Sequence, residues 1–115
     1  MAIKVKSKLW IEIDDRPVFG SGRKMLLLAI EKHGSINRAA REMAITYRKA
    51  WGYIKAMVKR LGFPLVESKT GGRYGGGTAL TPRARFLLMQ FMALEAGIQE
   101  MVDAKFKNLF PDSEV

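Results

Sequence analysis

The sequence predicts a mainly α-helical domain with a small β component, and three features support this prediction. The chain has 115 residues, 48% of them hydrophobic, which is enough for one core and too little for a second lobe. Apolar residues recur at helical spacing in several segments, and short runs with strand-like alternation or glycine-rich turns flank those segments. The length excludes a large multi-lobed enzyme. With no cysteine and one histidine, disulfides, thiolate metal sites and paired-histidine metal motifs are excluded too.

Positive charge is concentrated in the first two thirds of the chain. Residues 1–82 carry 16 basic and 6 acidic side chains, whereas residues 83–115 carry 4 and 5. The longest purely apolar run, 25–30, has six residues, so we expect no signal peptide, no membrane span and a cytoplasmic location. A basic domain of this kind favours polyanionic partners.

The first elements are a strand and a helix. Aliphatic residues alternate with polar ones over residues 3–13, which predicts a strand, and Asp14 and Asp15 then favour a turn over a metal pair. Leu26, Leu27 and Ile30 have helical spacing and predict a helix over 23–32. His33 and Gly34 end this helix, where a cation suits the helix dipole.

Two further helices follow in close succession. Ser35 is placed to cap a short helix that contains Ala39 and Ala40, and the chain turns at residues 44–45. Thr46 is placed to cap a third helix, which ends at Gly62. The apolar residues of this third helix follow the i, i+3, i+4, i+7 rule, and they are Tyr47, Ala50, Trp51, Ile54, Met57, Val58 and Leu61.

A β-hairpin and a long helix complete the chain. Residues 65–68 and 78–80 predict two strands around a glycine-rich loop, which lacks the Gly-Lys-Ser/Thr ending of a nucleotide phosphate loop. Thr81 and Pro82 start a helix that continues to about residue 109. Its apolar residues occupy more than one side, so we expect it to pair with a second copy. The predicted dimerisation residues are Leu87, Leu88, Phe91, Met92, Leu94, Ile98, Met101 and Val102.

This order of elements is that of a winged helix-turn-helix domain. We expect residues 1–82 to form that domain with its N-terminal strand, residues 83–110 the dimerisation helix, and residues 111–115 a frayed tail. The third helix suits the major groove of duplex DNA, and the hairpin suits the flanking phosphates or minor groove. Trp51 favours core packing, whereas Tyr47 suits either the core or a phosphate. The predicted DNA-binding residues are Ser35, Asn37, Thr46, Tyr47, Arg48, Lys49, Gly52, Tyr53, Lys55, Lys59, Lys69, Arg73 and Tyr74.

Several motifs resemble known families of regulators. The segments Gly34-Ser35-Ile36-Asn37-Arg38-Ala39-Ala40, Ile45-Thr46, Leu61-Gly62-Phe63-Pro64-Leu65-Val66-Glu67 and Leu80-Thr81 resemble the DNA-binding domain of LysR-type regulators. The segments Thr46-Tyr47-Arg48-Lys49-Ala50-Trp51 and Thr70-Gly71-Gly72-Arg73-Tyr74-Gly75-Gly76-Gly77, with the long helix, resemble the N-terminal domain of the ModE-type molybdate-responsive family. The resemblance covers roughly residues 10–102. It implies a winged helix-turn-helix homodimer on a palindromic operator.

The expected function is sequence-specific regulation of transcription through double-stranded DNA. The alternative is a non-specific architectural protein that coats or bends DNA. No convergent acid/base or metal constellation is present in the sequence, so we expect neither an enzyme nor a cofactor or metal. The oxyanion-binding domains of full-length ModE-type members have no counterpart in these 115 residues, and we expect no small-molecule effector within this chain.

Overall fold

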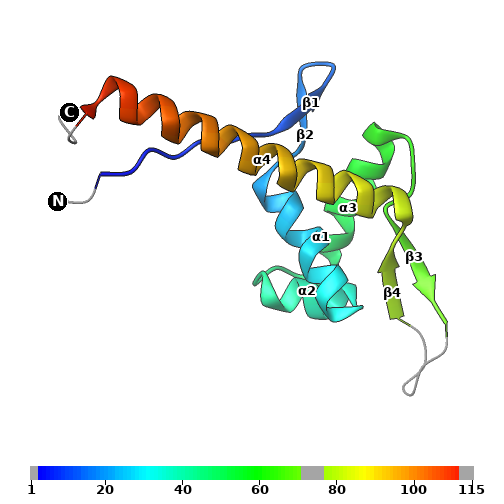
Figure 1. Ribbon diagram of the computed structural model, residues 1–115. Coiled ribbons are helices and arrows are strands. Elements are labelled where there is room, and N and C mark those ends of the chain that lie inside the picture. Colours follow the sequence, from blue (N-terminus) through cyan, green and yellow to red (C-terminus); the bar gives the residue numbers. More distant parts are fainter. Residues whose placement is uncertain (1–2, 71–76, 112–115) are drawn as a thin grey trace.

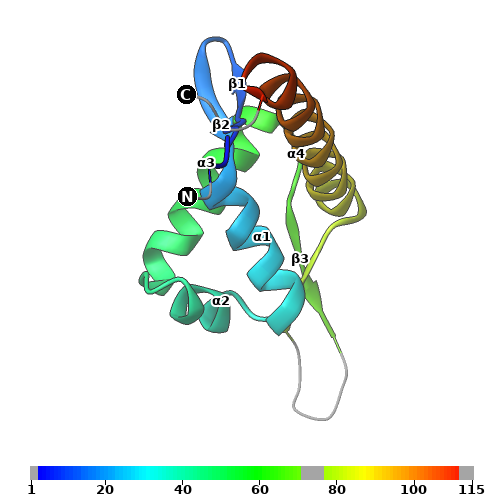
Figure 2. The same cartoon turned by 60° about the vertical axis from the view of Figure 1, so that its left-hand side comes forward.

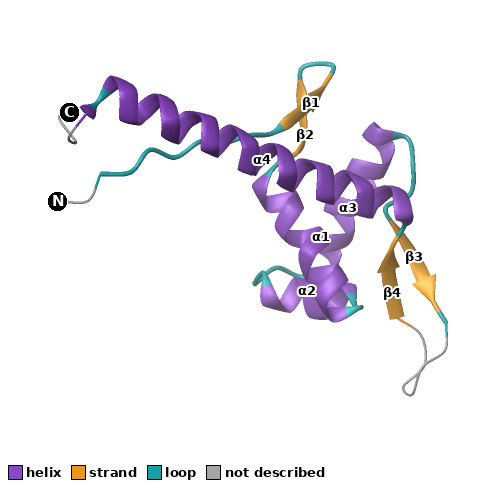
Figure 3. Cartoon of the chain, in the orientation of Figure 1, coloured by secondary structure: helices purple, strands orange, loops and turns teal. Residues whose placement is uncertain are grey.

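The computed structural model describes residues 3–70 and 77–111, which form four helices and two small antiparallel sheets (Figures 1 and 3). In chain order the elements are β1 (Ile11–Ile13), β2 (Arg16–Phe19), α1 (Ser21–His33), α2 (Ile36–Glu42), α3 (Tyr47–Leu61), β3 (Val66–Lys69), β4 (Gly77–Leu80) and α4 (Pro82–Leu109). None of the helices in these two stretches combines the length and hydropathy that a bilayer-crossing segment requires.

Three hydroxyl side chains cap the helices that the sequence assigned to them. Ser35 Oγ accepts a hydrogen bond from the Arg38 amide at 3.1 Å, and Thr46 Oγ1 accepts one from the Lys49 amide at 3.0 Å. Thr81 Oγ1 does the same for the Ala84 amide at 3.1 Å. Each cap satisfies a backbone N–H that has no partner inside the helix. The starts of α2, α3 and α4 are therefore fixed by single side chains, as predicted.

Glycines end α1 and α3. Gly34 and Gly62 adopt φ values of 62° and 83°, and their amides bond to Ile30 and Val58. Backbone at such φ values costs glycine little, because it has no Cβ to clash with the preceding turn. The predicted helix ends are confirmed.

The predicted N-terminal strand is wrong for most of its length. β1 begins only at Ile11, and β2 pairs with it across a turn in which Asp14 and Asp15 have φ values of 51° and 64°. Two positive φ values in succession are those of a tight hairpin turn, in which aspartate is favoured. The turn was predicted, but the returning strand β2 was not.

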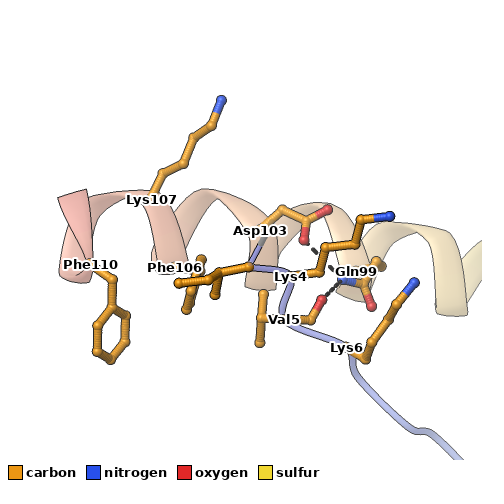
Figure 4. Close-up of a pocket in the computed structure, with 9 residues that line it drawn as sticks. Lys4, Val5, Lys6, Gln99, Asp103, Phe106, Lys107 and Phe110 are labelled. Atoms are coloured by element: carbon orange, nitrogen blue, oxygen red, sulfur yellow. Dashed lines mark hydrogen bonds between the residues drawn. The ribbon is translucent and has the colours of Figure 1, made fainter. Parts of the chain in front are cut away.

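Residues 3–10 instead run along the distal half of α4 without forming a strand (Figure 1). Gln99 of α4 donates from Nε2 to the Val5 carbonyl at 2.9 Å and accepts at Oε1 from the Ser7 amide at 2.9 Å. A groove of about 650 Å³ lies between this segment and α4. Phe106 and Phe110 are among the side chains that line it (Figure 4). The side-chain amide of Gln99 thus supplies backbone hydrogen bonds that a neighbouring strand would otherwise provide.

The core joins α1, α2 and α3 to β2, the hairpin base and the first part of α4. Phe19 and Phe91 pack edge to face with their ring centroids 4.9 Å apart, and both are essentially inaccessible to solvent. Ala39 and Ala40 are fully buried between α2 and its neighbours, where their small side chains permit close approach of the helices.

Burial corrects the prediction that Leu88 and Phe91 belong to a dimer face. Leu88 is 4% exposed and Phe91 2% exposed, and both belong to the core of their own protomer. They cannot meet a second copy while that core is intact. Leu87 is half-buried and packs at the margin of the same core.

Candidate nucleic-acid interface

The exposed face of α3 is basic along its whole length. It carries Arg48, Lys55 and Lys59 at steps of seven and four residues, which places them in one row on a helix. Lys49 and Arg60 lie on the other side of this face, and α3 contains no acidic residue. Within residues 3–70 and 77–111, none of Arg48, Lys49, Lys55 and Lys59 forms an ion pair. Like charges held this close repel each other, so an anionic partner would lower their energy.

A strip of small residues lies between the two basic rows of α3. Gly52 and Ala56 occupy it, both are exposed, and a Cβ built on Gly52 would meet no atom within 4 Å. The backbone of another molecule can therefore approach the helix closely along this strip, while long cationic side chains reach around it on both sides.

Tyr53, one of the predicted DNA-binding residues, is half-buried and covered by a cation from α1. The Arg23 guanidinium of α1 lies 3.7 Å from the centre of the Tyr53 ring, and Lys49 Nζ lies 5.9 Å from it. The ring is therefore half-covered, and a cation over its face is a favourable contact. Arg23 is absent from the predicted site residues, because no spacing rule joins a residue of α1 to one of α3.

The two other aromatic residues of α3 take different positions. Trp51 is half-buried against the core, which confirms its predicted packing role. Tyr47 is 51% exposed and meets Trp51 edge to face at 6.4 Å. Its hydroxyl is therefore free of the core, in the first turn of α3 next to Thr46 and Arg48.

Helix α2 adds further exposed cations beside α3. Arg38 and Arg41 are exposed on α2, and neither is among the DNA-binding residues predicted from the sequence. Asn37 is exposed as expected, while the Ser35 hydroxyl is already engaged as the helix cap. The position of Arg38, three residues after a capping serine, was the available signal.

One acidic residue lies at the end of α2, and it is paired. Lys32 Nζ donates to Glu42 Oε1 at 2.9 Å, and His33 Nε2 lies 3.3 Å from the same oxygen. Lys32, and after it His33, lowers the pKa of the Glu42 carboxyl below its ordinary value. This carboxylate is thus neutralised by α1 and offers little opposition to an anionic partner.

The β3–β4 hairpin lies beside α1. Lys69, the last residue of β3, is exposed and forms no ion pair in the described parts of the chain. The predicted contacts Arg73 and Tyr74 lie outside the described residues. Figure 2 shows α2 and the described end of the hairpin on the same side of the molecule, with the end of α1 between them. The exposed cations of α2 and of the described end of β3 therefore belong to elements on one side of the molecule.

The described residues contain no cluster of three or more potential metal-ligating side chains. The chemistry that the basic surface can perform is binding through charge-assisted hydrogen bonds to anionic oxygen atoms.

Comparison with known proteins identifies relatives of the chain. The family model for bacterial regulatory helix-turn-helix proteins of the lysR family matches residues 25–85. The chain is 40% identical over 90 residues to the molybdenum-pterin-binding protein MopB of Rhodobacter capsulatus, which covers 78% of this chain and 33% of that protein. It is 37% identical over 102 residues to the molybdenum transport protein ModE of Azotobacter vinelandii, with 89% and 38% covered. The chain therefore spans about a third of the length of these curated relatives.

Solved structures share the fold. The protein chain in the BenM_DBD/benA site 1 DNA complex superposes with a TM-score of 0.54 at 21% identity, covering 77% of this chain and 93% of that one. VV2_1132, a LysR family transcriptional regulator, gives a TM-score of 0.53 at 17% identity, covering 77% of this chain and 28% of that one. At these identities the likeness establishes the architecture.

Proposed function

The chain belongs to the lysR family of bacterial regulatory helix-turn-helix proteins, and from this premise we propose that it regulates transcription by binding specific sequences in double-stranded DNA. The names of the relatives support this reading, because they include transcriptional regulators and a DNA-binding domain solved with its DNA site.

The exposed face of α3 is the observation that carries the proposal. The major groove of B-DNA admits one α-helix, and the N-terminal residues of a recognition helix contact base edges. Arg48 lies in the first turn of α3 and is exposed, so it is assigned to a base edge. Lys55 and Lys59 lie further along the same row and are assigned to phosphates.

The remaining contacts surround this helix. Thr46, Tyr47 and Lys49 are exposed at the start of α3, Gly52 is exposed further along α3, and Asn37 is exposed at the start of α2. All five suit the backbone of the same duplex. Lys69 extends the contact to the hairpin. Arg73 and Tyr74 are retained as proposed contacts from the sequence alone, and Ser35 and Tyr53 contribute by capping α2 and by supporting Arg23.

A homodimer completes the proposal. On the distal half of α4, Leu94 and Met101 are 49% and 58% exposed, and they lie seven residues apart with Ile98 between them. This spacing is that of a coiled-coil seam. A two-fold dimer built on it would place two α3 helices on an inverted repeat, with half-sites ~10 base pairs apart or a multiple of that. Val102 lies at the margin of this seam. Met92 lies on the other side of α4, where it lines a groove with Ser7 and Gln99, so it is not part of the proposed seam.

Selection of bound genomic fragments followed by affinity measurement tests the function. We expect an inverted repeat to be enriched and to bind about a thousandfold or more tighter than random duplex at the same salt. Binding with equal affinity to every duplex would instead indicate an architectural DNA-binding protein. A plot of log affinity against log salt with a slope near zero would contradict DNA binding itself, since each phosphate contact contributes about −0.9 to that slope.

Arg48→Ala tests the assignment of the base contact. We expect it to cost about 1–3 kcal/mol on the selected operator and to relax preference at one base pair. Lys107→Ala removes the same charge from the last turn of α4 and should leave specificity unchanged. An equal loss on all sequences would make Arg48 a phosphate contact.

A further inference from the structure

The hairpin touches the helix-turn-helix at one unusually close point. The Thr78 amide donates to the Gly34 carbonyl at 2.9 Å, and a Cβ built on the neighbouring Gly77 would lie 2.6 Å from that same oxygen. Real Cβ atoms essentially never approach within 3.0 Å. Gly77 is the first residue of strand β4, and it is the lack of space for a Cβ that demands glycine at this position.

Gly34 is itself a fixed point of the fold. Its amide bonds to the Ile30 carbonyl at 2.8 Å as the left-handed end of α1, and Ser35 follows it as the cap of α2. The corner between α1 and α2 is thus rigid on both sides. A strand that hydrogen-bonds to this corner takes its position from it.

The hairpin is also attached to the body at its base. The Thr81 amide donates to the Leu65 carbonyl at 3.0 Å, the Thr81 hydroxyl donates to the Pro64 carbonyl at 2.8 Å, and Leu80 is buried. Between this base and Gly77 most residues of the two strands are exposed or half-buried. The contact at Gly34 therefore sets the angle at which the two-stranded ribbon leaves the body.

The angle of the ribbon determines the position of Lys69. It lies directly opposite Gly77 in the antiparallel register, and directly opposite residues project to the same face of a ribbon. A Cβ built on Gly77 would point toward Gly34. Lys69 therefore lies on the face of the ribbon that is directed toward the corner between α1 and α2. It is exposed there and has no acidic partner among the described residues.

We propose that Gly77 is a positioning residue, whose close contact with Gly34 holds Lys69 in place to bind a phosphate of the duplex that α3 occupies. The proposal rests on the proposed function. Any larger residue at position 77 would push the ribbon away from the corner and carry Lys69 with it. The helix-turn-helix itself would remain intact, because its core does not include Gly77.

The salt dependence of operator binding tests this role. Lys69→Ala should reduce the magnitude of the slope of log affinity against log salt by about 0.9, the value for one phosphate contact. Gly77→Ala should reduce the slope by the same amount and weaken binding by the same factor. The double variant, Lys69→Ala with Gly77→Ala, should bind no more weakly than either single variant. A displaced Lys69 no longer contacts the phosphate, so replacing it removes no further interaction.

Gly62→Ala is the matched control. It replaces another glycine, at φ 83° with no atom within 4 Å of the added Cβ, so it should lower the melting temperature through strain without changing the salt slope. Thr78→Pro is a second variant, which removes the donor to Gly34 while leaving Gly77 in place, and it should reproduce the slope of Gly77→Ala.

Three outcomes would overturn the inference. Gly77→Ala with the parental slope would mean that the ribbon is placed by other contacts, and additive losses in the double variant would mean that Gly77 acts independently of Lys69. Loss of the folded state in both Gly77→Ala and Thr78→Pro would make the contact a folding requirement. A parental chain with no steep slope would instead contradict the proposed function, so the two failures are distinguishable.

Discussion

The two halves of α4 are stabilised by different neighbours. Ala84, Leu88 and Phe91 are buried in the core of the protomer, and all three lie in the half of the helix that crosses the body. From Met92 to Leu109 no residue is buried. One continuous helix therefore packs into the core along its first half and is largely exposed along its second half.

The boundary between the halves is marked by an ion pair. Lys24 of α1 donates to Glu95 at 2.8 Å, with both side chains largely shielded from solvent. Beyond it, the hydrogen bonds from α4 to other elements of the described chain are those of Gln99 with the N-terminal segment. The length of α4 thus exceeds what the protomer core requires, and this excess is the basis for the proposed dimer.

Phe91→Ala should have the largest effect, because it acts on the half of α4 that belongs to the core. Removing this ring leaves a cavity beside Phe19 and should lower the free energy of unfolding by about 3–5 kcal/mol. Met101→Ala, at an exposed position of the same helix, serves as the control in urea denaturation of dilute protein. Equal losses at the two positions would show that the halves do not differ.

Met101→Glu should separate dimerisation from folding. A carboxylate in an apolar seam loses its hydration without gaining a partner, so we expect at least a tenfold rise in the dimer dissociation constant, about 1.4 kcal/mol. Sedimentation equilibrium measures the constant, and circular dichroism verifies that the helices persist. Met89→Glu is a matched control, because Met89 is 61% exposed on the opposite side of α4. Dissociation by Met89→Glu alone would place the seam on that side.

Local signals in the sequence predicted the elements that single residues determine. Ser35, Thr46 and Thr81 cap their helices as expected, and Gly34 and Gly62 end theirs. These features depend on hydrogen bonds within a few residues, so a pattern of neighbours is sufficient. The match of the lysR family model to residues 25–85 likewise confirms the resemblance read from the same stretch.

Long-range features were outside the reach of these signals. Alternation over residues 3–13 indicates extended backbone, but it cannot tell a paired strand from a segment that bonds to Gln99, 92 residues from Ser7. Apolar stripes on α4 indicate several contacts without stating which stripe meets the protomer's own core, and Leu88 and Phe91 were misassigned for this reason. In the candidate site, the basic row of α3 was predictable from spacing. The coverage of Tyr53 by Arg23 and the contact of Gly77 with Gly34 were not, since both join distant parts of the chain.

Gln99→Leu should loosen the N-terminal segment and leave the body unaffected. The variant keeps a side chain of similar size but removes the acceptor for the Ser7 amide and the donor to the Val5 carbonyl. Each such hydrogen bond contributes about 0.5–1.5 kcal/mol, so the Ser7 amide should exchange with solvent several-fold faster by NMR. Gln90→Leu, at an exposed position of α4, is the control. Unchanged protection of Ser7 would mean that apolar contacts along the groove hold the segment.

Glu42→Gln should have the smallest effect, because it removes a surface ion pair within the body rather than packing. Lys32 and His33 lower the pKa of this carboxyl from its ordinary value of 4.5. A lowered pKa contributes stability above the ordinary value, and that contribution disappears as the pH falls through the lowered one. The variant should therefore unfold at a slightly lower urea concentration than the parent at pH 6, and the two should converge as the pH falls below the lowered pKa of Glu42. In a Lys32→Met background the difference at pH 6 should shrink, because the first cause of the shift is gone. If Glu42→Gln at pH 6 lowered the free energy of unfolding as much as Phe91→Ala does, exposed charges would stabilise the body as strongly as its packed core. The contrast between the packed and the uncovered half of α4 would then not explain the stability of the protomer.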